Sequence, residues 1–314
     1  MPSYLTIFSA TLPVFLVIAI GFFFNRRGWL NEETEVGVMK LGLNLLVPCL
    51  ILNLIPGNPA LQTLSSAGWA IGLGFGLIVT GFAVAWVVAR LSGIQRGEGL
   101  RTFTICTGIQ NYGYLPLPIL VEIFPDNPGP AGLVFVHGVG VELAMWTVGL
   151  AILTKKAGLK SLVNGPFIAV LVALGLNFTG GHHYIPGIVT TITDMLGRCA
   201  IPMAIFMIGA TMSKFFTREI LHDAVRVALS SIFTRIVLLA ALMLVVAKFA
   251  PVSDDLRRLL VVQAAMPAAV YPIVLSRLFG GQPEVAIKVV LATSFVSLIT
   301  SPLVIAWGLT WLGV

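Results

Sequence analysis

Long apolar runs recur along the entire chain and limit its fold more than any other feature. A helix needs about 20 apolar residues to cross the hydrocarbon of a bilayer, and turn-forming residues such as Gly280-Gly281-Gln282-Pro283 separate runs of that length. Hydrophobic residues make up 57% of the chain and charged residues 10%, against about a quarter charged in soluble domains. The sequence therefore predicts an all-α membrane protein with ten transmembrane helices, near 4–24, 36–55, 68–91, 101–123, 131–154, 163–180, 190–212, 221–249, 256–279 and 284–312.

The 19 Lys and Arg residues are distributed unevenly around these helices. If the N-terminus lies outside, the outside loops contain only Lys248, Arg257 and Arg258, whereas Arg198 and Arg235 fall within helices and the rest lie in inside loops. Basic loop residues favour the cytoplasmic side. We therefore expect a multi-pass protein of the plasma membrane, or the inner membrane of a bacterium, with both termini outside. The same bias explains the net charge of +6 without a nucleic-acid partner.

The two halves of the chain carry proline and glycine at matching positions, offset by about 153 residues, a pattern typical of an internal repeat. Each half contains five predicted helices, an odd number, so the second half enters the membrane from the opposite side. Inverted repeats of this kind are typical of carriers, which alternate between inward-open and outward-open states. The matching pairs are Pro13 with Pro166, Gly21 with Gly175, Pro48 with Pro202, Pro118 with Pro272, and Pro130 with Pro283.

Predicted helices 4 and 9 are interrupted by prolines in the middle of the membrane. A proline removes an amide donor and clashes with the carbonyl one turn back, so the helix breaks and exposes a half-helix N-terminus that attracts anions. The opposite ends would suit a cation, and the alternative is a pair of proline kinks repacked by neighbouring helices. The candidate substrate-binding residues are Gln110, Asn111, Tyr112, Gly113, Leu115, Pro116, Pro118, Gln263, Met266, Pro267 and Tyr271.

Two motifs in these breaks resemble the auxin efflux carrier family. They are Asn111-x-Gly113-Tyr114-Leu115-x-Leu117-Pro118 and Gln263-Ala264-Ala265-Met266-Pro267-Ala268, the second followed by Gly280-Gly281-x-Pro283-Glu284. The resemblance covers the whole chain. It implies two inverted five-helix repeats in which helices 4 and 9 cross, as in bile-acid symporters, and we place the crossing at Pro118 and Pro267. Asn111 matches the family asparagine that contacts the substrate carboxylate.

The resemblance also implies an elevator mechanism. Residues 1–65 and 160–215 would form a scaffold domain from helices 1, 2, 6 and 7, often dimeric, and residues 66–159 and 216–314 would form the moving transport domain. Plant members carry a long loop between helices 5 and 6, whereas this chain has only about Lys155 to Leu162 there. Phosphorylation-based regulation therefore does not carry over, and the bacterial members suggest dicarboxylates such as malate or malonate as substrates.

Charged groups inside the membrane are rare and are functional candidates. Glu142 lies mid-helix near His137, and it either binds a coupling proton or sodium ion or neutralises Arg198 or Arg235. Arg198 either faces the transport path or extends to the interface, whereas Arg235 is the better candidate for an internal ion pair. So few acidic residues in the helices argue against a carrier driven by several sodium ions.

The expected function is secondary active transport of a small organic anion across the bilayer by a homodimer. A sodium-coupled symporter of the bile-acid type is the alternative carrier, and a channel or sensor is the alternative class. The chain has no HExxH motif and no paired aspartates within a helix, so we expect no enzymatic activity. No cofactor and no metal site are expected.

Overall fold

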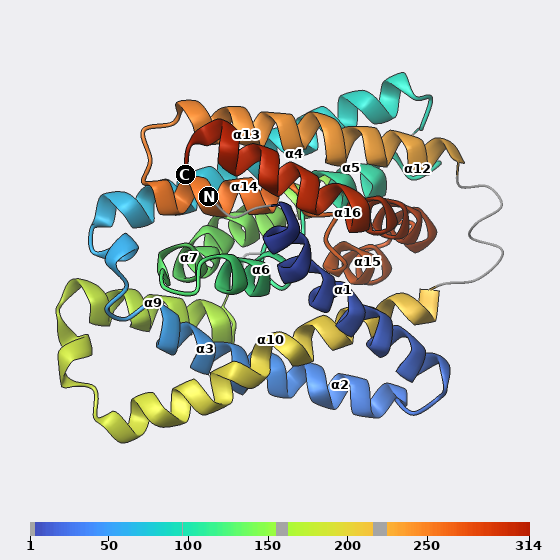
Figure 1. Ribbon diagram of the computed structural model, residues 1–314. Helices are drawn as coiled ribbons and strands as arrows, with labels where there is room; N and C mark the ends of the chain where they lie inside the picture. Colours follow the sequence, from blue (N-terminus) through green and yellow to red (C-terminus); the bar gives the residue numbers. More distant parts are fainter. Residues whose placement is uncertain (1–3, 96, 155–162, 216–224) are drawn as a thin grey trace.

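The computed structural model describes residues 4–95, 97–154, 163–215 and 225–314 (Figure 1). The predicted loop from Lys155 to Leu162 and the start of predicted helix 8 at 221–224 lie outside these residues. Within the described residues the regular elements are helices, so the all-helical prediction is confirmed. Seven described segments are long and apolar enough to cross a membrane: Tyr4–Arg26, Glu32–Leu54, Leu64–Leu91, Gly129–Thr154, Gly187–Lys214, Val225–Phe249 and Pro283–Leu312.

Four of these segments are continuous α-helices, and the remaining predicted helices take other forms. The continuous ones are α1 (Tyr4–Arg26), α4 (Leu64–Leu91), α10 (Gly187–Phe215) and α16 (Pro283–Leu312). A shorter apolar helix, α9 (Gly165–Phe178), lies where helix 6 was predicted. Predicted helices 4 and 9 are each divided in two, as α5 (Leu100–Gly108) and α6 (Pro116–Ile123), and as α14 (Asp254–Ala264) and α15 (Tyr271–Leu278).

Three further segments contain a π-helical turn, a form often found at functional sites. Pro48 accounts for the first, because it is the second residue after the turn and has no N–H to donate to the carbonyl of Asn44 within that turn. The third includes Arg235. The segments are α2 (Glu32–Leu41), η1 (Gly42–Leu46) and α3 (Val47–Leu54); α7 (Gly129–Ala144), η3 (Met145–Gly149) and α8 (Leu150–Thr154); and α12 (Val225–Ile232), η6 (Phe233–Leu239) and α13 (Ala240–Phe249).

The helices pack as two groups (Figure 1). In one group, α10 contacts α1, α2 and α3, and α3 also contacts α9. In the other group, α4 contacts α5 and α7, while α16 contacts α5, α12, α14 and α15. Glycines permit close backbone approach in both groups, because a Cβ on Gly209 would overlap the backbone of Ile18 and one on Gly140 would overlap that of Ile71.

Two loops join the halves of the chain in a reciprocal manner. The loop before α7 reaches the N-terminus of α14, where Asn127 Nδ2 donates to Asp255 Oδ1 at 2.7 Å. The loop before α16 reaches the N-terminus of α5, where the backbone amide of Gln282 donates to Thr102 Oγ1 at 2.9 Å. Each half therefore supplies a loop that holds the divided helix of the other half.

Candidate functional site at the crossing of two broken helices

The two divided helices meet where both are interrupted. The backbone amide of Asn111 donates to the Pro267 carbonyl at 2.8 Å, and the backbone amide of Ala269 donates to the Ile109 carbonyl at 2.9 Å. These bonds form an antiparallel bridge between Gln110 and Ala268. Residues 109–111 and 267–269 are therefore paired as two very short extended segments, which we call the crossing.

The crossing lies near the middle of the predicted membrane span. The half-helices on either side contain 9 residues in α5, 8 in α6, 11 in α14 and 8 in α15. At about 1.5 Å per residue, each is about 12–17 Å long. That is about half of the 30 Å hydrocarbon thickness. Irregular backbone at this depth is tolerated only when it is buried in protein or lines a polar cavity.

Polar side chains from neighbouring helices satisfy the irregular backbone. Ser301 Oγ on α16 donates to the Ala265 carbonyl at 2.8 Å, and the Ala268 amide donates to Thr293 Oγ1 at 3.2 Å. Gln263 Nε2 donates to the Tyr112 carbonyl at 2.8 Å, which links the two breaks directly. A buried backbone group without a partner would cost several kcal/mol in hydrocarbon, so these three side chains stabilise the crossing.

Asn111 lies in the interruption, four residues before the N-cap of α6, and is buried. Its Oδ1 accepts a hydrogen bond from the Leu115 amide at 3.2 Å, and the Leu117 amide donates to the Gly113 carbonyl at 3.1 Å. These two backbone amides at the N-terminus of α6 are therefore already bonded within the chain. The positive end of the helix dipole remains, and the Asn111 side chain carries an NH₂ group that can donate hydrogen bonds.

Glu142 on α7 connects the break in helix 4 to the first group of helices. Tyr112 Oη donates to Glu142 Oε1 at 3.3 Å, and Asn164 Nδ2, at the N-cap of α9, donates to Glu142 Oε2 at 3.3 Å. No arginine in the described residues forms an ion pair with Glu142, so neutralisation by Arg198 or Arg235 is excluded there.

His137, also on α7, contacts the other break. Its Nδ1 lies 3.4 Å from Gln263 Nε2, and the side chain is fully buried. The Gln263 side chain therefore lies between His137 and the Tyr112 carbonyl. Although His137 and Glu142 are near neighbours in the sequence, their side chains have different partners.

The two arginines predicted within helices lie in different environments. Arg198 is on the surface of α10, with its side chain 77% exposed, and it pairs with Asp194 one turn earlier at 2.9 Å. Arg235 is 1% exposed, but within the described residues it has no carboxylate partner, so the predicted internal ion pair is wrong. Its Nη1 instead donates to Gln110 Oε1 at 3.5 Å.

Most of the predicted binding residues are at or next to the crossing. Gln110, Asn111, Met266 and Pro267 are buried there, whereas Pro118 lies within α6 and does not mark the crossing, because prolines are tolerated in the first turn of a helix. Gly113 lies in the interruption, Leu115 and Pro116 begin α6, and Tyr271 begins α15 with a partly exposed side chain.

Residues that the sequence prediction missed are the hydroxyls of α16 and Asn164. Thr293, Ser297 and Ser301 are buried and four residues apart, so they share one face of a helix. That spacing was the signal in the sequence. Asn164 carried no comparable signal, because its importance depends on the position of Glu142.

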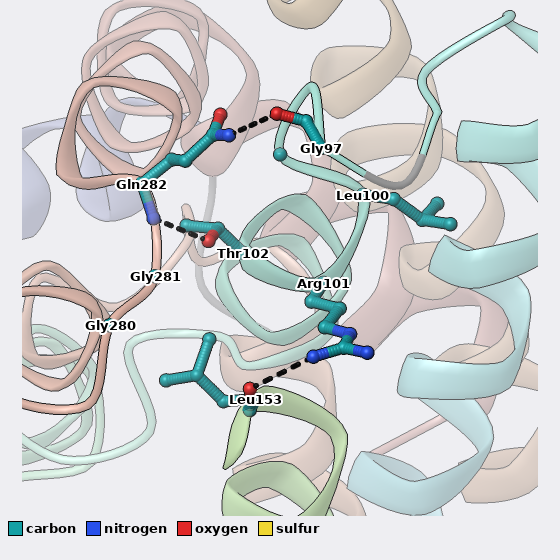
Figure 2. Close-up of a pocket in the computed structure, with 9 residues that line it drawn as sticks. Gly97, Leu100, Arg101, Thr102, Leu153, Gly280, Gly281 and Gln282 are labelled. Carbon is teal, nitrogen blue, oxygen red and sulfur yellow. Dashed lines mark hydrogen bonds between the residues drawn. The ribbon is translucent and has the colours of Figure 1, made fainter. Parts of the chain in front are cut away.

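A cavity of about 300 Å³ lies at the N-terminus of α5, away from the crossing (Figure 2). Gln282 extends across it, with its side-chain amide bonded to the Gly97 carbonyl, and Arg101 Nη1 donates to the Leu153 carbonyl at 3.5 Å. The nine residues of α5 separate this cavity from the break. It is lined by Gly97, Gly99, Leu100, Arg101, Thr102, Leu153, Gly280, Gly281 and Gln282.

Apolar spanning helices with a buried polar crossing are typical of membrane transporters, and comparison with known proteins identifies the class. A family model described as "Membrane transport protein" matches the chain twice, at residues 6–161 and 150–305. The chain therefore belongs to this family of auxin efflux carrier-like membrane transport proteins. It functions as a transporter and not as an enzyme.

Two archaeal relatives align with nearly the full length of the chain. An uncharacterized transporter of Methanothermobacter thermautotrophicus is 24% identical over 305 residues, covering 94% of this chain and 96% of the relative. An uncharacterized transporter of Methanocaldococcus jannaschii is 23% identical over 313 residues, covering 96% and 97%. Neither name specifies a substrate.

Proposed function

We propose that the chain is a secondary carrier for small organic anions and that its substrate binds at the crossing. The observation that carries this proposal is the pairing of 109–111 with 267–269. It brings the N-termini of α6 and α15 to a buried polar region near mid-membrane, where positive helix ends stabilise an anion. A carboxylate suits the side-chain amide of Asn111 and the hydroxyl of Tyr271, whereas the Tyr112 hydroxyl already donates to Glu142.

The proposed mechanism is an elevator movement of one group of helices against the other. Residues 1–65 and 160–215 form the scaffold, and residues 66–159 and 216–314 carry the substrate. The more extensive packing of α1, α3, α9 and α10 among themselves supports this division, and the contacts of α1 with α6 and α16 lie between the two groups. The proposal includes ten membrane-crossing units in two inverted repeats, with both termini outside the plasma membrane or bacterial inner membrane.

Glu142 is the proposed coupling residue. It is a partly buried carboxylate whose two oxygens bond to a tyrosine of the break and to an asparagine of the proposed scaffold. Binding of a proton or a sodium ion by Glu142 would weaken these two bonds and so connect ion binding to movement between the groups. The scaffold is also the proposed homodimer interface, and malate or malonate are the substrates to test first.

Counterflow in proteoliposomes tests the carrier proposal. Vesicles loaded with unlabelled malonate should accumulate radiolabelled malonate transiently, and the initial rate should saturate. A channel would give no accumulation above equilibrium. Replacing external sodium with choline at several pH values separates sodium coupling from proton coupling. Asn111→Ala should abolish counterflow, whereas Asn44→Ala, at an exposed side chain that bonds to its own helix, should retain it.

A further inference from the structure

Arg235 is buried next to the crossing without a negative partner in the described part of the chain. Its side chain is 1% exposed and lies in the π-helical turn η6. Its Nη1 bonds to Gln110 Oε1 at 3.5 Å and its Nη2 to the sulfur of Met243 at 3.4 Å, both neutral groups. Burying an uncompensated charge is strongly unfavourable, so this position requires a counter-charge.

The unpartnered side-chain atoms of the Arg235–Gln110 pair are hydrogen-bond donors. Neither Arg235 Nε nor Gln110 Nε2 has a partner in the described residues, although both atoms are fully buried. Thr107, three residues before Gln110, has a buried hydroxyl that is also unpartnered there. Arginine and the carboxamide nitrogen only donate, so the group that completes this pair must accept hydrogen bonds and carry negative charge.

The Arg235–Gln110 pair lies on a different side of the crossing from Asn111. Successive side chains of an extended segment point to opposite faces, and Gln110 and Asn111 are neighbours in such a segment. The Gln110 side chain points toward η6, whereas the Asn111 side chain accepts a hydrogen bond from the Leu115 backbone amide at the N-cap of α6. A ligand held by Arg235 is therefore distinct from one held by Asn111 alone.

We propose that Arg235 and Gln110 form a buried binding site for a small anion, either a carboxylate group or a halide ion. The guanidinium supplies the charge and the Nε donor, and the Gln110 amide supplies the second donor. Since Gln110 is paired with Ala268 of the opposite break, an anion bound here contacts a residue of the crossing. The site adds to the proposed carrier, and it does not depend on the identity of the transported substrate.

Thermal unfolding of the purified full-length chain tests this site directly. Chloride, acetate or malonate is titrated at constant ionic strength against a bulky sulfonate salt. At least one of these anions should raise the unfolding midpoint of the wild type in a saturable manner, because a ligand of the native state stabilises it. A rise with chloride but not with acetate or malonate assigns a halide site, and a rise with acetate or malonate but not with chloride assigns a carboxylate site.

The variants separate an anion site from a purely structural arginine. Arg235→Met should lose the anion-dependent rise yet unfold in the sulfonate salt at a midpoint no lower than the wild type, since the uncompensated charge is gone. Gln110→Leu should retain the rise with about 10- to 100-fold weaker binding. Arg226→Met, at an exposed arginine of α12, is the matched control and should behave as the wild type.

Two results would overturn the proposal. The first is the absence of an anion-dependent rise in the wild type. The second is an unchanged anion-dependent rise in Arg235→Met or, should that variant fail to fold, unchanged affinity in Gln110→Leu. Both readouts measure binding, so a failure of transport assays with every tested substrate would leave this experiment fully informative.

Discussion

Gly81→Ala should damage the crossing from a distance, because Gly81 on α4 packs against the end of α5. A Cβ at this position would lie 2.6 Å from the Gly108 carbonyl oxygen, and ordinary van der Waals contact begins at 3.4 Å. The two backbones would have to separate by about 0.8 Å at the residue that precedes the crossing. Overpacking against rigid backbone destabilises by about 1–3 kcal/mol.

The matched control is Gly76→Ala on the same helix, where an added Cβ would meet no atom within 4 Å. That change should be neutral or stabilise by up to about 1 kcal/mol, because alanine is the better helix former. Unfolding in mixed detergent–SDS micelles gives the free energies, and malonate uptake gives the activity. If Gly81→Ala is as stable and as active as Gly76→Ala, the close approach of α4 to α5 is not as described.

Two further substitutions test the polar groups around the crossing. Glu142→Gln is expected to flatten the pH dependence of uptake, since glutamine keeps an acceptor oxygen but cannot bind a proton, whereas Glu122→Gln, at an exposed position on α6, should leave the pH profile unchanged. An unaltered pH profile in Glu142→Gln would show that Glu142 does not couple proton binding to transport. Ser301→Ala leaves the Ala265 carbonyl without its donor and should lower the free energy of unfolding by about 1–3 kcal/mol. The control is Thr310→Ala, which should have little effect because the Thr310 hydroxyl bonds within its own helix. Equal stability of the two variants would contradict the role of Ser301.

The positions of the helices were largely predictable from the sequence, because apolar length and turn chemistry determine them. Predicted 4–24 corresponds to Tyr4–Arg26, and predicted 284–312 corresponds to Pro283–Leu312. Helix 2 begins earlier than its predicted start at 36, at Glu32, because the side chain of Asn31 caps it. The π-helical turn around Arg235 had no sequence signal, since no proline follows it.

The site was predictable in its location but not in its contacts. The paired prolines located the breaks, yet Pro118 was taken for the crossing although it belongs to α6. Arg235 was expected to form an ion pair because charge burial usually demands one, and its neutral partners Gln110 and Met243 come from tertiary packing that spacing cannot reveal. The same is true of Asn164, whose link to Glu142 joins α9 to α7.

The most direct test of the account is a current recorded on a solid-supported membrane from the reconstituted protein. Pulses of malate, malonate, a monocarboxylate and indole-3-acetate would be applied to the wild type, Asn111→Ala and Asn44→Ala. We expect a saturable current for at least one acid, absent in Asn111→Ala and retained in Asn44→Ala. An equally large, saturable current in Asn111→Ala would contradict the placement of the substrate at the crossing.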